Sequence, residues 1–375
     1  MKKKIIIIGA GIAGLTLGNF LQKKLDYEFI IYEKAERLNL DEGFGIQLAP
    51  NSVSILNKIG FNKLNKFDFF NPKTIEFYST QDKVCDLDLT QFNTTTEKYT
   101  TLKRSSLIKF LKDKLFSNAL RFNKTIEKVT HKENKIQIKF TDGDTDEADY
   151  LVVSDGVFSA TKTIIEEKKT KIIFQGAFAA RTTIGKDIFK SLKKENISLI
   201  MCSNAHLVFY PVNDDEYNFV AILRNKANAA DNKNKKLLNN ILQQNNLNIS
   251  FDKDISFWPI YSSNKPAISK YKNAFFLGDA LYTFLPTMAQ GASQSIESAD
   301  ELFRILEKKN SHDKQDIYFA NRLERIEIIS KRSKFNFFAF HLSKPFFTAI
   351  RNFILRKLIY NKKFIDTFLG RVFRK

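Results

Sequence analysis

The chain has 375 residues, a hydrophobic content of 43% and a formal net charge of +19. This length and composition exclude a disordered chain and predict one large domain or two closely joined domains. The two distant cysteines, Cys85 and Cys202, exclude a disulfide scaffold, and no apolar stretch is long enough to cross a bilayer.

The first predicted elements are a buried strand, a glycine-rich turn and a helix. Residues 5–8 are a β-branched run typical of a strand in a parallel sheet. The following GAGIAG places Gly9, Gly11 and Gly14 in the spacing GxGxxG. This spacing allows a tight turn, a close backbone approach to a pyrophosphate and close helix packing. It predicts the start of a dinucleotide-binding unit.

The same opening letters also resemble the charged and apolar regions of a secretion signal. No small-x-small cleavage site follows, and a second strand is predicted over residues 27–32. That strand ends at Glu33, about 20 residues after the glycines, where an acidic side chain binds ribose hydroxyls. We therefore expect a nucleotide-binding unit rather than a signal peptide.

Two later Asp-Gly or Gly-Asp pairs follow predicted strands. Asp155-Gly156 follows residues 150–153, and such a pair alone is typical of a turn. Asp279 ends a short strand that begins at Ala274, and it precedes Pro286 and a helix from about Ser293. An aspartate in this position can accept hydrogen bonds from sugar hydroxyls, and the helix start can stabilise negative charge.

The middle of the chain alternates β-rich runs with polar turns. We expect an antiparallel sheet here, with an exposed helix over residues 225–248. His206, Tyr210 and Arg181 lie on predicted strands. His206 and Tyr210 fit either core positions or a substrate pocket. Arg181 is expected to be a solvated strand arginine, and the alternative is that it faces the substrate.

The segment 341–375 is rich in Lys, Arg and Phe and is predicted to be helical. Ile350, Phe353, Ile354 and Leu358 recur at helical spacing. Two alternatives stay open: this helix packs its apolar face on the body of the protein, or it touches an anionic membrane surface.

Taken in order, these motifs resemble those of the class A FAD-dependent aromatic monooxygenases, the family of the p-hydroxybenzoate and salicylate hydroxylases. The resemblance covers nearly the whole chain. It implies that the protein binds FAD through nine residues: Gly9, Gly11, Gly14, Glu33, Arg104, Asp155, Asp279, Gly291 and Ala292. The sequence departs from the family pattern at Leu281, Tyr282, Ala289 and Lys162.

The implied fold is α/β, with a Rossmann-like FAD-binding domain, an inserted antiparallel-sheet substrate domain and a helical C-terminus. We expect a discontinuous FAD-binding domain over residues 1–70, 100–170 and 265–330. A β-rich substrate domain is expected over residues 71–99 and 171–264. The C-terminal helical segment is expected over residues 331–375.

The resemblance implies hydroxylation of a phenolic or aromatic substrate with NADH or NADPH and O2, through a flavin hydroperoxide. It names no catalytic acid or base, so the pocket candidates are Pro286, Tyr210 and His206. Neither the scattered histidines nor the cysteines predict a metal site.

Two other functions remain as alternatives. One is a membrane-associated polyprenyl-phenol hydroxylase of quinone biosynthesis, to which the basic, aromatic C-terminus points. The other is a basic nucleic-acid-binding protein, for which the net charge is the sole support. Because lysines are scattered along the chain, we expect no nucleic-acid partner and a cytoplasmic protein, with peripheral membrane contact through 341–375 as the open question.

Overall fold

The structure is a computed structural model that describes residues 2–24, 26–40, 44–185, 195–225, 231–245, 247, 255–308 and 313–373. Its helices, from α1 to α10, are Ile12–Leu21, Pro50–Asn57, Arg104–Asp113, Ala160–Ile165, Asp231–Gln244, Gly291–Glu307, Lys314–Phe340, Pro345–Leu358, Lys362–Ile365 and Arg371–Phe373.

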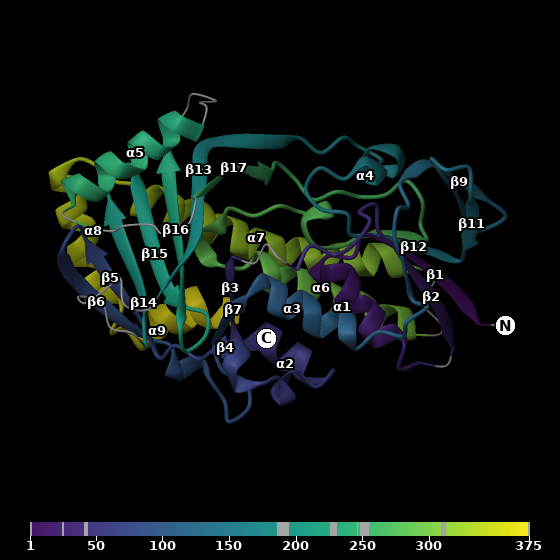
Figure 1. Ribbon diagram of the computed structural model, residues 1–375, viewed down its shortest axis with the longest axis horizontal. Coiled ribbons are helices and arrows are strands. Elements are labelled where there is room, and N and C mark those ends of the chain that lie inside the picture. Colours follow the sequence, from purple (N-terminus) through teal and green to yellow (C-terminus); the bar gives the residue numbers. More distant parts are fainter. Residues whose placement is uncertain are drawn as a thin grey trace.

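A parallel sheet, at the right of Figure 1, has the strand order β18-β12-β1-β2-β8. In chain order its strands are β1 Lys3–Ile8, β2 Tyr27–Tyr32, β8 Leu120–Arg121, β12 Tyr150–Val153 and β18 Ala274–Phe276. The apolar run in β1 is buried, as a strand covered on both faces requires. Helices α1, α3 and α6 pack beside this sheet.

A large sheet, at the left of Figure 1, has the strand order β17-β13-β16-β15-β14-β5-β6. Neighbouring strands are antiparallel except β14 and β5, which are parallel. The strands are β5 Thr74–Ser79, β6 Asp82–Asp88, β13 Ile172–Gly185, β14 Ile197–Cys202, β15 Ala205–Pro211, β16 Glu216–Arg224 and β17 Ser256–Ser263.

Helix α5 covers one face of the large sheet. The expectation of an exposed helix over residues 225–248 was wrong for its inner face, because Leu238, Ile241 and Leu242 are buried against the sheet. Residues 226–230, 246 and 248 lie outside the described part of the chain. The other face of the sheet is therefore left to line a site.

Smaller sheets complete the architecture. Strands β3 Gly45–Leu48, β7 Thr100–Lys103 and β4 Phe69–Phe70 form one of them, in the order β3-β7-β4. Strands β9 Ile126–Lys132, β10 Lys135–Phe140 and β11 Thr145–Ala148 form an antiparallel sheet beside β12. The main chain of Gly45 in β3 donates a hydrogen bond to Asn218 in β16, which ties the two halves of the molecule together.

The C-terminal part is helical, as expected. Residue 331, where we expected this segment to begin, lies inside α7, which runs without a break from Lys314 to Phe340. Ile365, Val372 and Phe373 pack into a core that also includes residues of β5, β6 and β14. Among the described residues, no helix is both long and apolar enough to span a membrane. The α/β fold class predicted from the sequence is confirmed.

Candidate functional site

A cleft lies between the carboxyl ends of the parallel sheet and the large sheet. Its larger part, a cavity of about 390 Å³ that we call the sheet half, is lined by side chains of β3, β13, β15 and β16 and by the start of α6. The other part, of about 370 Å³, follows the glycine-rich turn and is called the turn half. Both halves are lined by Gly11, Arg104, Ser154 and Gly156, so the cleft is continuous.

The three glycines of the turn have different surroundings. Gly9 has φ +98°, and a Cβ on it would lie 2.6 Å from the Ser154 carbonyl oxygen. A Cβ on Gly14 would lie 2.7 Å from Ser154 Oγ, so these two glycines serve the packing of the fold. A Cβ on Gly11 would meet nothing closer than the Ser154 carbonyl oxygen at 3.9 Å. Gly11 therefore keeps space free in the cleft itself.

Glu33 holds the turn from the end of β2. Its carboxylate accepts hydrogen bonds from the main-chain N–H groups of Ala10, at 2.8 Å, and Ala35, at 3.0 Å. It also lines the turn half. The N-terminus of α1 follows at once, and Gly11 as its N-cap provides no capping side chain. Its free N–H groups and positive dipole end can bind a phosphate.

Asp155 lies in the turn half after β12. Its Oδ2 accepts a hydrogen bond of 2.9 Å from Thr161 Oγ1. Its Oδ1 is buried and has no hydrogen-bond partner among the described residues. A buried carboxylate oxygen without a donor is rare in folded proteins, so this atom fits a ligand that brings a donor.

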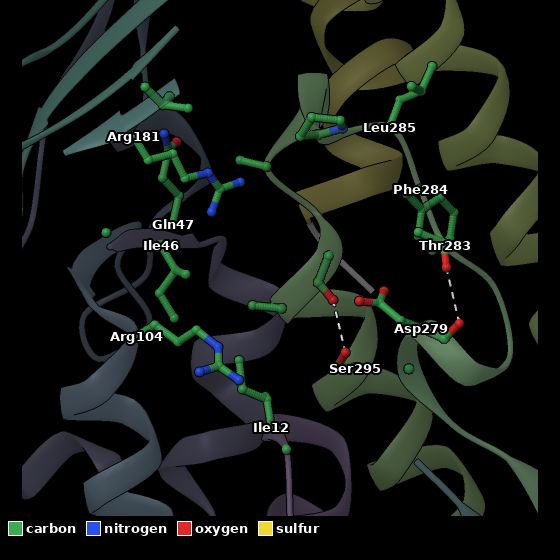
Figure 2. A pocket seen from close by; sticks show the side chains of 18 of the residues that line it. Ile12, Ile46, Gln47, Arg104, Arg181, Asp279, Thr283, Phe284, Leu285 and Ser295 are labelled. Carbon is green, nitrogen blue, oxygen red and sulfur yellow. Dashed lines mark hydrogen bonds between the residues drawn. The ribbon is translucent and has the colours of Figure 1, made fainter. Parts of the chain in front are cut away.

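Arg104 and Asp279 approach the cleft from opposite sides (Figure 2). Arg104 begins α3, and Asp279 follows β18. The side chain of Asp279 is exposed to the open cavity, but the protein atoms around it reduce its hydration and raise the pKa of its carboxyl group to about 6. The charges of Arg104 and Lys162 act in the opposite direction. Burial in turn lowers the pKa of Lys162, the residue found near the position of the family's arginine.

Helix α6 starts at the edge of the sheet half. It begins at Gly291, slightly before the predicted Ser293, and has neither a capping side chain nor an acidic residue in its first turn. Gly291 and Ala292 line the cavity, and a Cβ on Gly291 would meet nothing within 4 Å. The preceding Ala289 has φ +51°, a left-handed conformation that favours glycine. The helix start can stabilise an electron-rich group in the sheet half.

Arg181 lines the sheet half, and the expectation of a solvated strand arginine was wrong (Figure 2). Its Nε is buried without a hydrogen-bond partner among the described residues. Burial lowers the pKa of its guanidinium, and the charge of Arg104 lowers it further, whereas Tyr210 acts in the opposite direction. In the register of the sheet, Arg181 on β13 lies opposite Val220 on β16, which also lines the cavity.

Tyr210 and Pro286 also line the sheet half. Burial raises the pKa of the Tyr210 hydroxyl, and hydrogen bonds with Gln47 and Asn218 oppose this rise. Sequence reasoning missed Asn218, although its place on β16 opposite Tyr210 gives both side chains the same face of the sheet. Apolar side chains also line this half, among them Val208, Val220, Ile222, Phe284 and Leu285.

His206 lines the sheet half and pairs with His341, from the end of α7. The two nitrogens, His206 Nδ1 and His341 Nε2, lie 2.8 Å apart. Burial lowers the pKa of His206 to about 3 and also lowers the pKa of His341, which the charge of Arg224 lowers further. Both rings are therefore neutral at neutral pH. The pairing joins residues that are 135 positions apart, so no local pattern of residues could predict it.

Comparisons with known proteins agree with this geometry. The model of the FAD binding domain family matches residues 2–332. The 3-amino-4-hydroxybenzoate 2-monooxygenase of Streptomyces cremeus is 23% identical over 90% of this chain and 88% of its own length. The 6-hydroxynicotinate 3-monooxygenase of Bordetella bronchiseptica is 24% identical over 89% of this chain and 91% of its own length.

A solved structure with the same fold is that of Klebsiella pneumoniae HpxO complexed with FAD and uric acid. It superposes with a TM-score of 0.85 at 17% identity and covers 99% of this chain and 96% of its own.

Proposed function

Because this chain belongs to the FAD binding domain family and is a class A flavoprotein monooxygenase, we propose that it hydroxylates a small phenolic or related aromatic substrate with O2 and NADH or NADPH. The observation that carries the proposal is the continuous cleft. It joins the glycine-rich turn to the uncapped start of α6. The large sheet lines the cleft with both polar and apolar side chains. Relatives of similar length are named for aromatic acids.

The residues of the cleft fit FAD. In this proposal, Gly11 and the start of α1 bind the pyrophosphate, and Glu33 lies near the adenosine ribose. Gly9 and Gly14 allow the turn and the close helix packing that bring this backbone into place. The unpartnered Oδ1 of Asp155 and the carboxyl group of Asp279 accept hydrogen bonds from hydroxyl groups of the cofactor. Arg104 lies where the two halves meet.

At the other end, Gly291 and Ala292 at the start of α6 would hold the flavin end of the cofactor, and the uncapped helix start would stabilise negative charge there. When bound, FAD supplies the redox chemistry: it takes electrons from the pyridine nucleotide and activates O2.

The large sheet positions the substrate and keeps water away. Val208, Val220 and Ile222 present an apolar surface that excludes water from the reacting groups. Arg181 is half-buried beside them, and its buried Nε–H has no hydrogen-bond partner among the described residues, so we propose that it binds an anionic or hydroxyl substituent of the substrate ring. Such a contact would fix which ring carbon faces the cofactor.

The reaction is tested with the purified, FAD-loaded protein and a panel of hydroxylated benzoates, nicotinates and uncharged phenols. The expected result is that one group of aromatic compounds accelerates NADH or NADPH oxidation and gains one oxygen atom, measured by mass spectrometry. Oxidation that no compound of the panel accelerates, without any oxygenated product, would contradict the proposal.

The role of Arg181 is tested with Arg181→Gln, and Arg181→Lys serves as the control that keeps the charge. Loss of a charged hydrogen bond should raise KM for a carboxylated substrate by about 10- to 100-fold. KM for an uncharged phenol should change little. An equal rise for both substrates would show that Arg181 has a structural role alone.

A second candidate substrate is a polyprenylated phenol of quinone biosynthesis. In this case residues 341–375 would contact the membrane that holds the substrate. One observation favours it: large apolar side chains of α8 are exposed. The test compares kcat/KM for a phenol with and without a prenyl chain, in detergent micelles. A clear preference for the prenylated phenol supports this candidate, and equal values remove it.

A further inference from the structure

The outer face of α8 is apolar. Five of its side chains are exposed: Phe346 at 70%, Phe347 at 48%, Ile350 at 41%, Phe353 at 62% and Ile354 at 45%. Their spacing places them on one face of the helix. The packing of this face on the body of the protein, one of the two alternatives for this helix, is therefore wrong for Ile350, Phe353 and Ile354.

The inner face of α8 is held by polar contacts. Arg351 is 6% exposed and donates hydrogen bonds to Ser79 Oγ, at 3.0 Å, and to the Ala339 carbonyl, at 3.2 Å. Arg356 donates to the Val84 carbonyl at 3.3 Å, and Leu355 packs against the core beneath. The helix is thus docked with its arginine inward and its phenylalanines outward, the reverse of an ordinary surface helix.

Basic side chains surround this face. From residue 328 to residue 365 the chain contains Lys and Arg but neither Asp nor Glu. Lys344 precedes α8, and Lys357, Lys362 and Lys363 follow its apolar face, all of them exposed. The ammonium group of Lys357 lies 6.0 Å from the centre of the Phe353 ring. Phenylalanines flanked by cations complement a surface of acyl chains beneath anionic headgroups.

We infer that the outer face of α8 binds the surface of an anionic membrane. The helix lies in the plane of the interface, with Phe346, Phe347 and Phe353 among the acyl chains and the neighbouring lysines at the headgroups. Pairing with a second copy through the same face would bring the basic side chains of both copies together, which is unfavourable. In Figure 1, α8 lies at the end of the molecule away from the N-terminus.

The experiment is cosedimentation of the full-length protein with vesicles of phosphatidylcholine alone or with roughly one third phosphatidylserine. Wild-type protein should bind the anionic vesicles, and binding should weaken as salt is added. Phe346→Ser/Phe353→Ser should lower the partition coefficient by about tenfold or more, because two exposed aromatic rings are lost. Lys357→Glu/Lys362→Glu should lower it by a similar factor for the anionic vesicles.

The matched control is Phe67→Ser/Phe116→Ser, which removes two phenylalanines that are 73% and 62% exposed and lie outside α8. It should bind as the wild type does. Truncation before α8 is avoided because Ile365, Val372 and Phe373 belong to a core. Vesicle binding needs no turnover, so this inference and the proposed reaction can fail separately.

Two results would overturn the inference. The first is wild-type protein that stays in solution with both kinds of vesicle, or an equal loss of binding in the control. The second is a wild-type dimer in light scattering that the α8 variant converts to a monomer without any lipid binding, since the face would then join two copies.

Discussion

At the scale of single residues, Gly11 and Gly14 have the different surroundings that their places in the GxGxxG spacing predict. We predict that Gly14→Ala destabilises the protein by about 2 kcal/mol, because the added methyl group overlaps the Gly9 carbonyl and Ser154 Oγ. Gly11→Ala should fold normally and lose FAD affinity, because its methyl group enters the cleft. Thermal unfolding without FAD and an FAD titration measure the two effects. Equal FAD affinity in Gly11→Ala and wild type would contradict the assignment.

The pair of His206 and His341 makes a prediction about pH. Each ring has an ordinary pKa of 6.5 and a lowered value in the fold, so the unfolded chain binds more protons below pH 6.5. The free energy of unfolding should therefore fall as the pH drops, by about 1.4 kcal/mol per pH unit for each ring.

Denaturant unfolding at pH of about 7.5 and about 5.5 measures this loss. Wild type should lose about 2–3 kcal/mol more than His206→Gln/His341→Gln over that interval. The difference between the two pH values is compared, so a lower overall stability of the variant does not affect the test. Identical losses would mean that the rings are not buried as neutral groups.

Residue-scale prediction from the sequence succeeded where the signal is local. The positions of Gly9, Gly11 and Glu33 follow from spacing along one βαβ unit, and the structure brings all three to the turn half. Arg181 was misjudged because its environment comes from the opposing β3 and α6, which no local pattern reports. The roles of these residues toward FAD remain proposals.

At the scale of elements, α6 and α7 are joined by a buried ion-pair network. Glu297 of α6 is fully buried and accepts hydrogen bonds from Arg325 at 2.7 and 2.8 Å and from Asn51 of α2. Arg322 lies 3.6 Å from the same carboxylate. Arg325 also donates to the carbonyl of Val372 at 2.7 Å, so the network reaches the C-terminal α10.

Glu297→Gln should lower the free energy of unfolding by about 3 kcal/mol, because Arg325 loses its carboxylate partner and the buried Arg322 keeps only Glu301, at 3.2 Å. Glu327→Gln is the control: Glu327 pairs with Lys331 at 3.8 Å on the surface, and its loss should change stability little. Urea unfolding of both variants measures this difference. Similar stabilities would show that the network holds the helices less tightly than its geometry indicates.

Helices and strands could be predicted from the sequence where the spacing of apolar residues alone determines the element. The run of residues 5–8 and the helix after it were predicted because their apolar patterns match β1 and α1. The continuous α7 was not predicted. The outward apolar face of α8 was one of two alternatives, because helical spacing shows that a face exists but not what it meets. The exposed phenylalanines of α8 depend on Arg351 docking inward, a tertiary contact.

At the scale of the whole molecule, the cleft is built by segments from distant parts of the chain. The turn half comes mainly from the first 40 residues and from 104–161, and the sheet half adds β13, β15, β16 and the start of α6. The fold class could be predicted because each motif carried its own signal in chain order. Tyr210 was a pocket candidate, but its grouping with Arg181 and Asn218 in one polar wall could not be predicted, because it depends on the register of β13, β15 and β16.

The central claim is that one FAD occupies both halves of the cleft. The direct measurement is the visible absorption spectrum of the purified protein during titration with FAD, in wild type, Gly11→Ala and Gly291→Ala. We predict one FAD per wild-type chain and weaker binding in both variants, which change opposite ends of the cleft. Folded wild-type protein that takes up no FAD, or affinity that neither variant changes, would contradict the account.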